Sequence, residues 1–326
     1  AIKRLESRYY RQMEDDVADC YHPYEERFAY QGPTLRPPLQ AYEIACRAYA
    51  RANMGEHGVV LAENVISRYG QLSNERTTPS NTMMISVMKA WLKESNIERA
   101  EYWLRRMEEN FESSGNVNHI PNSELAYTPF LRALARNTRR LPDRDAADKS
   151  MDKINTLRSY FDKVKNPRVL PTSRAYIAAM RCQKEGLPEA EAFERTKSLF
   201  SLLNEDFKET VEHGSMNLAL RRLKPTKNSA VRVVIAASKC TGKEAADHKC
   251  LNEVEGIIHD YRRLYEETND DDYRPLPIMY DICFSLFGRM KFIRSPKVLS
   301  KRVFSLLEAM NHDQICIHSG PVTAAL

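Results

Sequence analysis

The stretch that decides the fold begins at Leu170 and reads LPTSRAYIAAMRCQKE. A proline followed by Thr172 is a typical helix start, because the threonine hydroxyl accepts a hydrogen bond from a free amide of the first turn. Apolar residues then recur three and four positions apart, which is the spacing of one helix face. Tyr176 is the first large residue of that face, and Cys182 is a small residue further along it. The stretch therefore predicts an amphipathic helix that begins just after Pro171.

The same frame occurs six times along the chain. Each copy opens with a proline, and successive prolines lie 42, 42, 50, 54 and 50 residues apart. Self-similarity at such a period indicates a repeat protein. The six prolines are Pro37, Pro79, Pro121, Pro171, Pro225 and Pro275. The expected N-caps are Ser80, Asn122, Thr172 and Thr226.

Each copy also carries a large or apolar residue, here called the anchor, five residues after its proline. One extra residue delays the anchor in the third copy. The anchors are Tyr42, Met84, Tyr127, Tyr176, Ala230 and Tyr280. Six positions after each anchor comes a residue that is small in five of the six copies. A small residue there would let a neighbouring helix approach closely. These residues are Ala48, Ala90, Ala133, Cys182, Ala236 and Leu286.

A second amphipathic stretch follows each of these first helices, for example AEYWLRRMEENF from Ala100 and VEGIIHDYRRLY from Val254. Neither helix of such a pair can bury its apolar face alone, so the pairs must stack. We therefore predict an all-α fold, a single solenoid over residues 1–326 built from about six stacked helix-turn-helix repeats. A partial repeat over residues 1–35 would precede them. The predicted repeats span residues 36–77, 78–119, 120–169, 170–223, 224–273 and 274–326.

Composition narrows the class of protein. The chain has 49 basic and 44 acidic residues, a net charge of +5 that is too mild to name a partner. Its seven scattered cysteines contain no CxxC pair, which indicates reduced thiols. No window of 18 apolar residues occurs, so we expect no membrane span. The chain opens at Ala1 without a hydrophobic leader, so we expect a processed or missing start, which leaves room for a transit peptide.

Catalytic and metal-binding patterns are weak. Cys240, His248 and Cys250 lie near one another in sequence but lack the four-ligand spacing of a zinc site. Gly242 and Lys243 lack the leading glycine of a phosphate-binding loop. We interpret the acidic run at residues 269–272 as a solvated linker. The alternative is that it contacts a basic protein or a metal ion. We expect no enzyme activity, no cofactor, no metal and no small-molecule substrate.

The proline-led starts resemble the pentatricopeptide repeat family. The residues that carry the resemblance are PTSRAYIAAM from Pro171, PSNTMMISVMKAW from Pro79 and AEYWLRRMEE from Ala100. It covers most of residues 36–310, with repeats longer than the family's usual length. The tetratricopeptide repeat is the nearest rival, but its Trp-Leu-Gly pattern is not seen. The resemblance implies a right-handed α-solenoid that binds single-stranded RNA along its concave face, in mitochondria or chloroplasts.

In the resembling family, the residue just after the anchor and the residue just after the next proline choose the base. Short polar side chains are needed to hydrogen-bond a base, and several positions here are aliphatic. Only Thr128 with Thr172 has suitable chemistry, so we expect little sequence-specific reading. The base-reading slots of this chain are Glu43, Ile85, Thr128, Thr172, Ile177, Val231 and Asp281.

Basic residues recur five and nine positions after the anchors. Positions four apart share one helix face, so stacked repeats would align them as a stripe. Nine of these twelve positions are basic and one is acidic. Lysine and arginine placed in this way grip backbone phosphates whatever the sequence. We call the nine the cation row: Arg47, Arg51, Lys89, Lys93, Arg132, Arg136, Arg181, Lys239 and Arg289.

The sequence thus predicts a non-catalytic RNA-associated scaffold that grips single-stranded or ribosomal RNA by its phosphates. Its expected setting is an organellar ribonucleoprotein such as the mitochondrial ribosome, in the matrix, with protein subunits as neighbours and no membrane partner; the chloroplast is the alternative. Two other functions stay open. One is a transcript processing or stability factor, which needs a working base code. The other is a protein-only adaptor, in which the cation row faces an acidic subunit.

Overall fold

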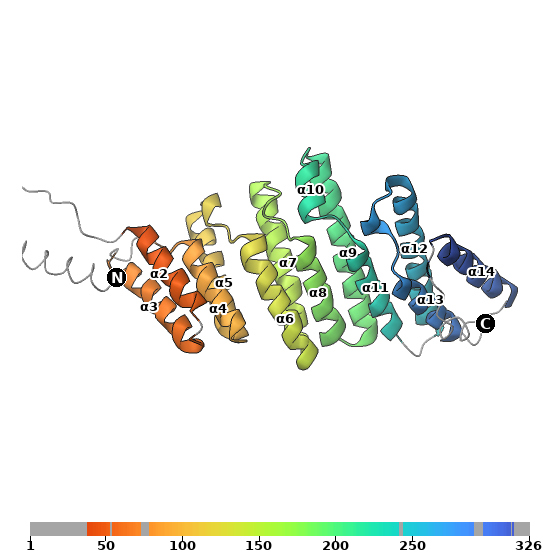
Figure 1. Ribbon diagram of the computed structural model, residues 1–326, viewed down its shortest axis with the longest axis horizontal. Coiled ribbons are helices and arrows are strands. Elements are labelled where there is room, and N and C mark those ends of the chain that lie inside the picture. The colour runs from red at the N-terminus through yellow and green to blue at the C-terminus, as the bar shows by residue number, and fades with distance from the viewer. Residues whose placement is uncertain are drawn as a thin grey trace, which may run out of the picture. The chain divides into compact units, whose positions relative to one another are not determined.

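The structure, a computed structural model, describes residues 38–52, 54–72, 78–240, 244–289, 296–313 and 315. Regular structure in these ranges is entirely helical, as predicted, and comprises α-helices with a few short turns of other helix types (Figure 1). The chain divides into two compact parts, Ala1–Pro121 and Asn122–Leu326, here called unit 1 and unit 2. The expected partial repeat over residues 1–35 lies outside the described residues.

Unit 1 contains two helix pairs. The first is α2 (Leu39–Arg51) with α3 (Glu56–Leu72), and the second is α4 (Asn81–Lys93) with α5 (Ile97–Ser114). A short turn, η2 (Val117–His119), follows α5. Helix α2 packs on α3 and α4, and α4 packs on α3 and α5. One carboxylate ties three of these helices together, because the indole N–H groups of Trp91 and Trp103 both donate to Glu63 Oε1, at 2.7 and 2.8 Å.

Unit 2 continues the alternation of first and second helices. First helices pack on one another in succession, α6 on α8, α8 on α11 and α11 on α13. Each of α7, α9 and α12 packs on the first helix of its own repeat and on that of the next repeat. The bounds are η3 (Ser123–Tyr127), α6 (Thr128–Arg140), α7 (Arg144–Val164), α8 (Ser173–Gly186), α9 (Glu189–Glu212), α10 (Met216–Arg222), α11 (Lys227–Lys239), α12 (Glu244–Thr268), η4 (Asp271–Tyr273), α13 (Pro277–Arg289) and α14 (Pro296–His312).

The predicted N-caps explain where the first helices begin. Ser80 Oγ accepts from the Met83 amide at 3.4 Å, and Thr172 Oγ1 accepts from the Ala175 amide at 3.1 Å. Asn122 Oδ1 accepts from the Glu124 and Leu125 amides. Each of these bonds satisfies an amide that has no partner inside the helix. These three N-caps are confirmed.

The extra residue of the third repeat is absorbed by a wider turn. Residues Ser123–Tyr127 form the π-helical turn η3, which runs directly into α6. A π-helical turn holds one more residue than an α-helical turn. Tyr127 is fully buried as a result, like the anchors of the other repeats.

All six anchors are buried, including the small Ala230. Beside Ala230, Tyr261 from α12 reaches the first turn of α11, where its hydroxyl donates to the Thr226 carbonyl at 3.1 Å. The small residues six positions after the anchors are also buried, with one exception. Ala48 is exposed on α2, so the prediction that it lies in a helix contact is wrong.

Two anchors belong to buried clusters that join three helices. The Tyr176 hydroxyl on α8 donates to Asp206 on α9 at 2.5 Å, and Arg158 Nε on α7 lies 3.0 Å from the same carboxylate. The equivalent residues two repeats later are Tyr280, Asp313 and Arg262, with an Arg262 Nε to Asp313 Oδ2 distance of 3.2 Å. Each cluster ties an anchor to the second helix of the preceding repeat and to a carboxylate on, or directly after, the second helix of its own repeat.

The Asp206 cluster makes stability depend on pH. Burial raises the pKa of Asp206 from 3.8 to about 6, and the Tyr176 hydroxyl and the Arg158 charge offset this only in part. The folded state then holds the proton more tightly than the unfolded state, so stability falls as pH rises from about 4 through about 6. Asp206→Asn removes this titration. We expect the variant to gain stability relative to the wild type between pH 4 and pH 7, by up to about 3 kcal/mol.

Chemical denaturation of both proteins across this pH range measures the effect. Two curves of unfolding free energy that stay parallel between pH 4 and pH 7 would contradict the assignment to Asp206.

Candidate nucleic-acid interface

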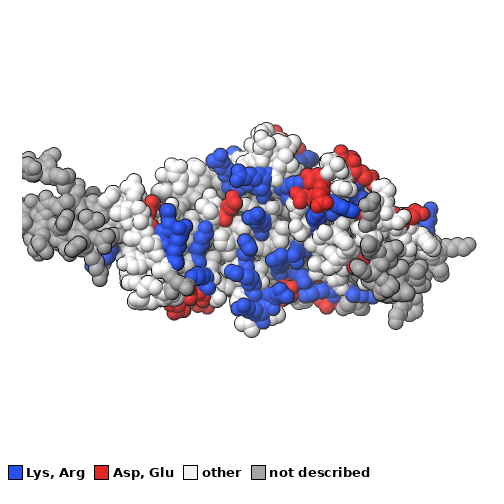
Figure 2. Space-filling model, viewed as in Figure 1, with Lys and Arg blue, Asp and Glu red and all other residues white. Residues whose placement is uncertain are grey.

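Every member of the cation row lies on a first helix: α2, α4, α6, α8, α11 or α13. Eight of the nine side chains are exposed, and Lys239 is half-buried. Figure 2 shows Lys and Arg side chains gathered over α4 in unit 1 and over α6, α8 and α11 in unit 2. The face that the first helices present is therefore strongly basic within each unit.

In unit 1 the row brings cations of two packed helices together. Arg47 and Arg51 lie on α2, and Lys89 lies on α4, which packs against α2. Partial burial and the positive charge of Arg51 both lower the pKa of Lys89. Among the residues that the structure describes, no carboxylate forms an ion pair with any of these three side chains. Arg51 and Lys89 are therefore like charges that lie close enough to interact, with no carboxylate paired to either among the described residues.

In unit 2 the row starts with Arg132 and Arg136 on α6 and Arg181 on α8. Helix α6 contains no acidic residue, and it packs directly on α8. Within the described part of unit 2, these three arginines have no carboxylate partner. All three are exposed and available to a ligand.

The last two members of the row differ from the rest. Lys239 Nζ lies 3.4 Å from Glu185 Oε2, so an ion pair within the chain already uses this charge. Partial burial raises the pKa of Glu185, but Lys184 and Lys239 outweigh it, and the pKa lies below its ordinary value. The Arg289 guanidinium donates to the Ser238 carbonyl at 2.8 Å, which leaves its charge unneutralised.

One cation of this face escaped the sequence pattern. Arg232 on α11 is close enough to Arg181 that the two charges interact. Partial burial and Arg181 lower the pKa of Arg232, while Glu185 acts in the opposite direction. The fixed spacing selected Ile235 on this helix, but Arg232 lies three residues before it and shares its face. A search for basic residues three positions before each expected basic position would have found Arg232.

The base-reading slots are mostly occupied by contacts within the protein. Thr128 and Thr172 are both buried, and their hydroxyl oxygens lie 2.9 Å apart in a hydrogen bond. Glu43 Oε1 accepts from the Ser80 hydroxyl at 2.6 Å. Ile85 and Val231 are buried, whereas Ile177 and Asp281 are half-buried. The threonine pair, which had the most suitable chemistry for a base, is thus satisfied inside the protein.

Cations on the second helices of unit 2 are arranged in the opposite way. Several of them pair with carboxylates 47 to 56 residues away, which is about one repeat, and others pair within their own helix. Pairs join α7 to α9, α9 to α12, and α12 to α14. They are Arg144–Glu191, Arg195–Asp148, Lys197–Glu253, Lys249–Glu194 and Arg302–Glu255. We call this set the ion-pair ladder.

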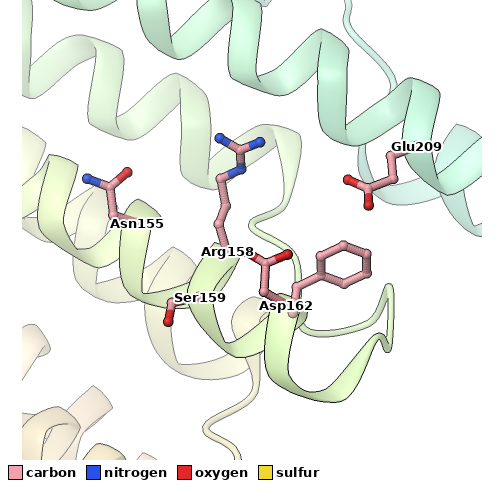
Figure 3. Close-up of a pocket in the computed structure, with 6 residues that line it drawn as sticks. Asn155, Arg158, Ser159, Asp162 and Glu209 are labelled. Atoms are coloured by element: carbon pink, nitrogen blue, oxygen red, sulfur yellow. The ribbon is translucent and has the colours of Figure 1, made fainter.

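A polar pocket of ≈ 320 Å³ lies beside the ladder, between α7 and α9 (Figure 3). Its lining includes Asn155, Arg158, Asp162 and Glu209. The Arg158 guanidinium already lies 3.0 Å from Asp206 and 3.4 Å from Glu205. The pocket's cation is therefore part of the structural pairing between repeats.

Other candidate chemistry is used internally. Asp270 and Asp272 both pair with Lys224, and Asp271 pairs with Lys227, so the acidic run neutralises two cations of its own chain. Within the described ranges no three His, Cys, Asp or Glu side chains gather to hold a metal ion. No helix in those ranges is both long and apolar enough to cross a bilayer. Gly242 and Lys243 lie outside the described residues.

Comparison with known proteins names no family. No protein-family model matches the chain, and no curated protein matches it either.

The contrast between the cation row and the ladder predicts different stability effects. Arg302 Nε lies 3.2 Å from Glu255 Oε1, and its NH2 group donates to Asn252 at 2.8 Å. Arg302→Gln should therefore lower the free energy of unfolding by about 1 kcal/mol. Arg132→Gln removes an exposed, unpaired cation and should change it by less than about 0.5 kcal/mol. Urea denaturation measures both, and equal losses would show that the row contributes to folding.

Proposed function

We propose that the protein is a non-catalytic RNA-associated scaffold of pentatricopeptide-like repeats that grips RNA phosphates with little base specificity. The proposal rests on exposed cations of α2 and α4 in unit 1 and of α6 and α8 in unit 2 that have no carboxylate partner among the described residues. They are Arg47, Arg51, Lys89, Arg132, Arg136 and Arg181. Arg51 with Lys89 and Arg181 with Arg232 are near enough for their charges to interact. Such repulsion is relieved when a polyanion lies along the helices.

The ion-pair ladder supports this interpretation because it shows what the chain does with cations elsewhere. On the second helices, Arg195 lies 2.5 Å from Asp148 and Arg158 lies 3.4 Å from Glu205, in each case a carboxylate of the adjacent repeat. Helices α4, α6 and α11 carry basic residues but no acidic residue at all. A series of phosphates is a ligand that supplies the missing negative charge at regular intervals.

The low base specificity is inferred from the side chains in the base-reading slots. Sequence is read by hydrogen bonds to base edges, which require free polar side chains. The Thr128 and Thr172 hydroxyls bond each other in a buried position, and Ile85 and Val231 have no hydrogen-bonding group. This arrangement favours a scaffold over a transcript-specific factor.

The cellular setting is part of the same proposal. The resemblance to pentatricopeptide repeats favours a mitochondrial ribonucleoprotein such as the ribosome, or its chloroplast counterpart. Phosphate contacts without base reading suit a subunit that other subunits hold in place. A right-handed solenoid through both units belongs to the proposal, and the successive packing of first helices in unit 2 supports it.

Salt dependence tests the phosphate grip. About five contacts to single-stranded RNA give a slope of log K against log salt near −3.5. Arg132→Glu and Arg136→Glu should weaken binding to oligouridine and to mixed-sequence RNA by the same factor. Removal of one phosphate-binding cation should make the slope shallower by about 0.7. Fluorescence anisotropy over a range of potassium chloride concentrations measures affinity and slope.

Lys208→Glu is the matched control, because this α9 side chain is 79% exposed and lies outside the cation row. It should leave affinity and slope nearly unchanged. Binding that ignores salt, or that Lys208→Glu weakens as much as Arg136→Glu does, would overturn the proposal.

A further inference from the structure

Helix α10 lies outside the alternation of first and second helices. It follows the second helix α9 through a turn at Gly214, whose φ of +74° favours glycine, and it precedes the next first helix, α11. It packs on α9. Met216 and Leu220, one turn apart on the same face, are 48% and 45% exposed. Only Ala219 of this helix is buried.

A hollow of ≈ 410 Å³ opens beside α10. One wall is the turn before α8, with Asn166, Pro167 and Arg168, and the other runs from Gly214 to Leu218. Met216 belongs to this lining, so an apolar side chain and a guanidinium group border the same space. Surface hollows that combine apolar area with a few polar groups are suited to binding.

Three arginines lie on α10 or on the turn that borders the hollow. Arg168 and Arg221 are exposed and have no acidic partner within the described part of the chain. The Arg222 guanidinium donates to the Arg168 carbonyl at 2.8 Å. Partial burial lowers the pKa of Arg222, Glu124 raises it and Arg168 lowers it further. Figure 2 shows Lys and Arg side chains gathered around α10.

We propose that the surface formed by Met216, Leu220, Arg168 and Arg221, here called the α10 surface, binds an acidic segment of a partner protein that carries apolar side chains. Guanidinium groups bind carboxylates through two parallel hydrogen bonds, which favours aspartate and glutamate. The apolar surface of Met216 and Leu220 contributes to binding only when apolar atoms of a ligand cover it and exclude water. An RNA backbone would satisfy the arginines but would leave both apolar side chains in water. This inference does not depend on RNA binding by the cation row.

Three labelled twelve-residue peptides serve as probes. The first alternates pairs of leucines with pairs of glutamates, the second has serine in place of leucine, and the third has glutamine in place of glutamate. Fluorescence anisotropy with the full chain should give a Kd of about 10 μM or tighter for the first peptide. The other two should bind at least about tenfold more weakly, because each lacks one of the two required features.

Substitutions then locate the site. Arg168→Glu and Arg221→Glu should each weaken binding of the first peptide about tenfold, as should Met216→Ser combined with Leu220→Ser. These side chains are exposed, so the variants should keep the wild-type circular dichroism. Lys301→Glu makes the same change of charge at an exposed residue of α14, which packs on α13, and should have no effect.

The same variants are titrated with single-stranded oligouridine. The proposal expects Arg168→Glu and Arg221→Glu to lose peptide affinity while keeping RNA affinity. Equal binding of all three peptides, or an unchanged affinity in the Met216 and Leu220 variant, would overturn it. Loss of RNA affinity in place of peptide affinity would assign the α10 surface to RNA and would also overturn it. Neither result affects the test of Arg132 and Arg136.

Discussion

Ion pairs between successive second helices are the constraint on which the account of unit 2 depends. Arg195 pairs with Asp148 and Arg302 with Glu255, in both cases 47 residues along the chain. Each second helix except the last also packs on two first helices, so the register of the second helices sets the spacing of the first helices. The buried Arg158, Asp206 and Tyr176 cluster fixes the same register from inside. The side chains that remain available for a ligand are those outside the ion-pair ladder and the Asp206 cluster.

Separation of charge by helix type gives this arrangement a functional meaning. Exposed ion pairs contribute little to stability one at a time, but a regular series uses up the cations of one face. Among the described residues, Arg132 and Arg136 on α6 and Arg181 on α8 lack that compensation, and in unit 1 the charges of Arg51 and Lys89 interact. A protein that gained nothing from this face could place glutamates there, as it does on α9. The proposed phosphate grip and the proposed α10 surface would use two chemically different kinds of contact.

Much of the fold was readable from the sequence because its signals are local. Proline, N-cap and anchor recur in one frame, and the extra residue before Tyr127 became a π-helical turn without disturbing burial of the anchor. The candidate site was harder to predict from the sequence because ion pairs join residues that are far apart along the chain. Lys239 fits the basic spacing, yet Glu185, on the preceding first helix, neutralises it. Arg232 breaks the spacing but lies on the same face, and only packing of α11 on α8 brings it near Arg181.

Arginine footprinting tests whether Arg132, Arg136 and Arg181 on the first helices bind a polyanion while Arg195 and Arg302 on the second helices stay paired within the chain. The full chain is treated with an arginine-selective dicarbonyl reagent, with and without single-stranded RNA, and modified peptides are quantified by mass spectrometry. The account predicts fast modification of Arg132, Arg136 and Arg181 that RNA suppresses, and slow modification of Arg195 and Arg302 that RNA leaves unchanged. Protection that falls equally on both helix types, or on the second helices alone, would contradict it.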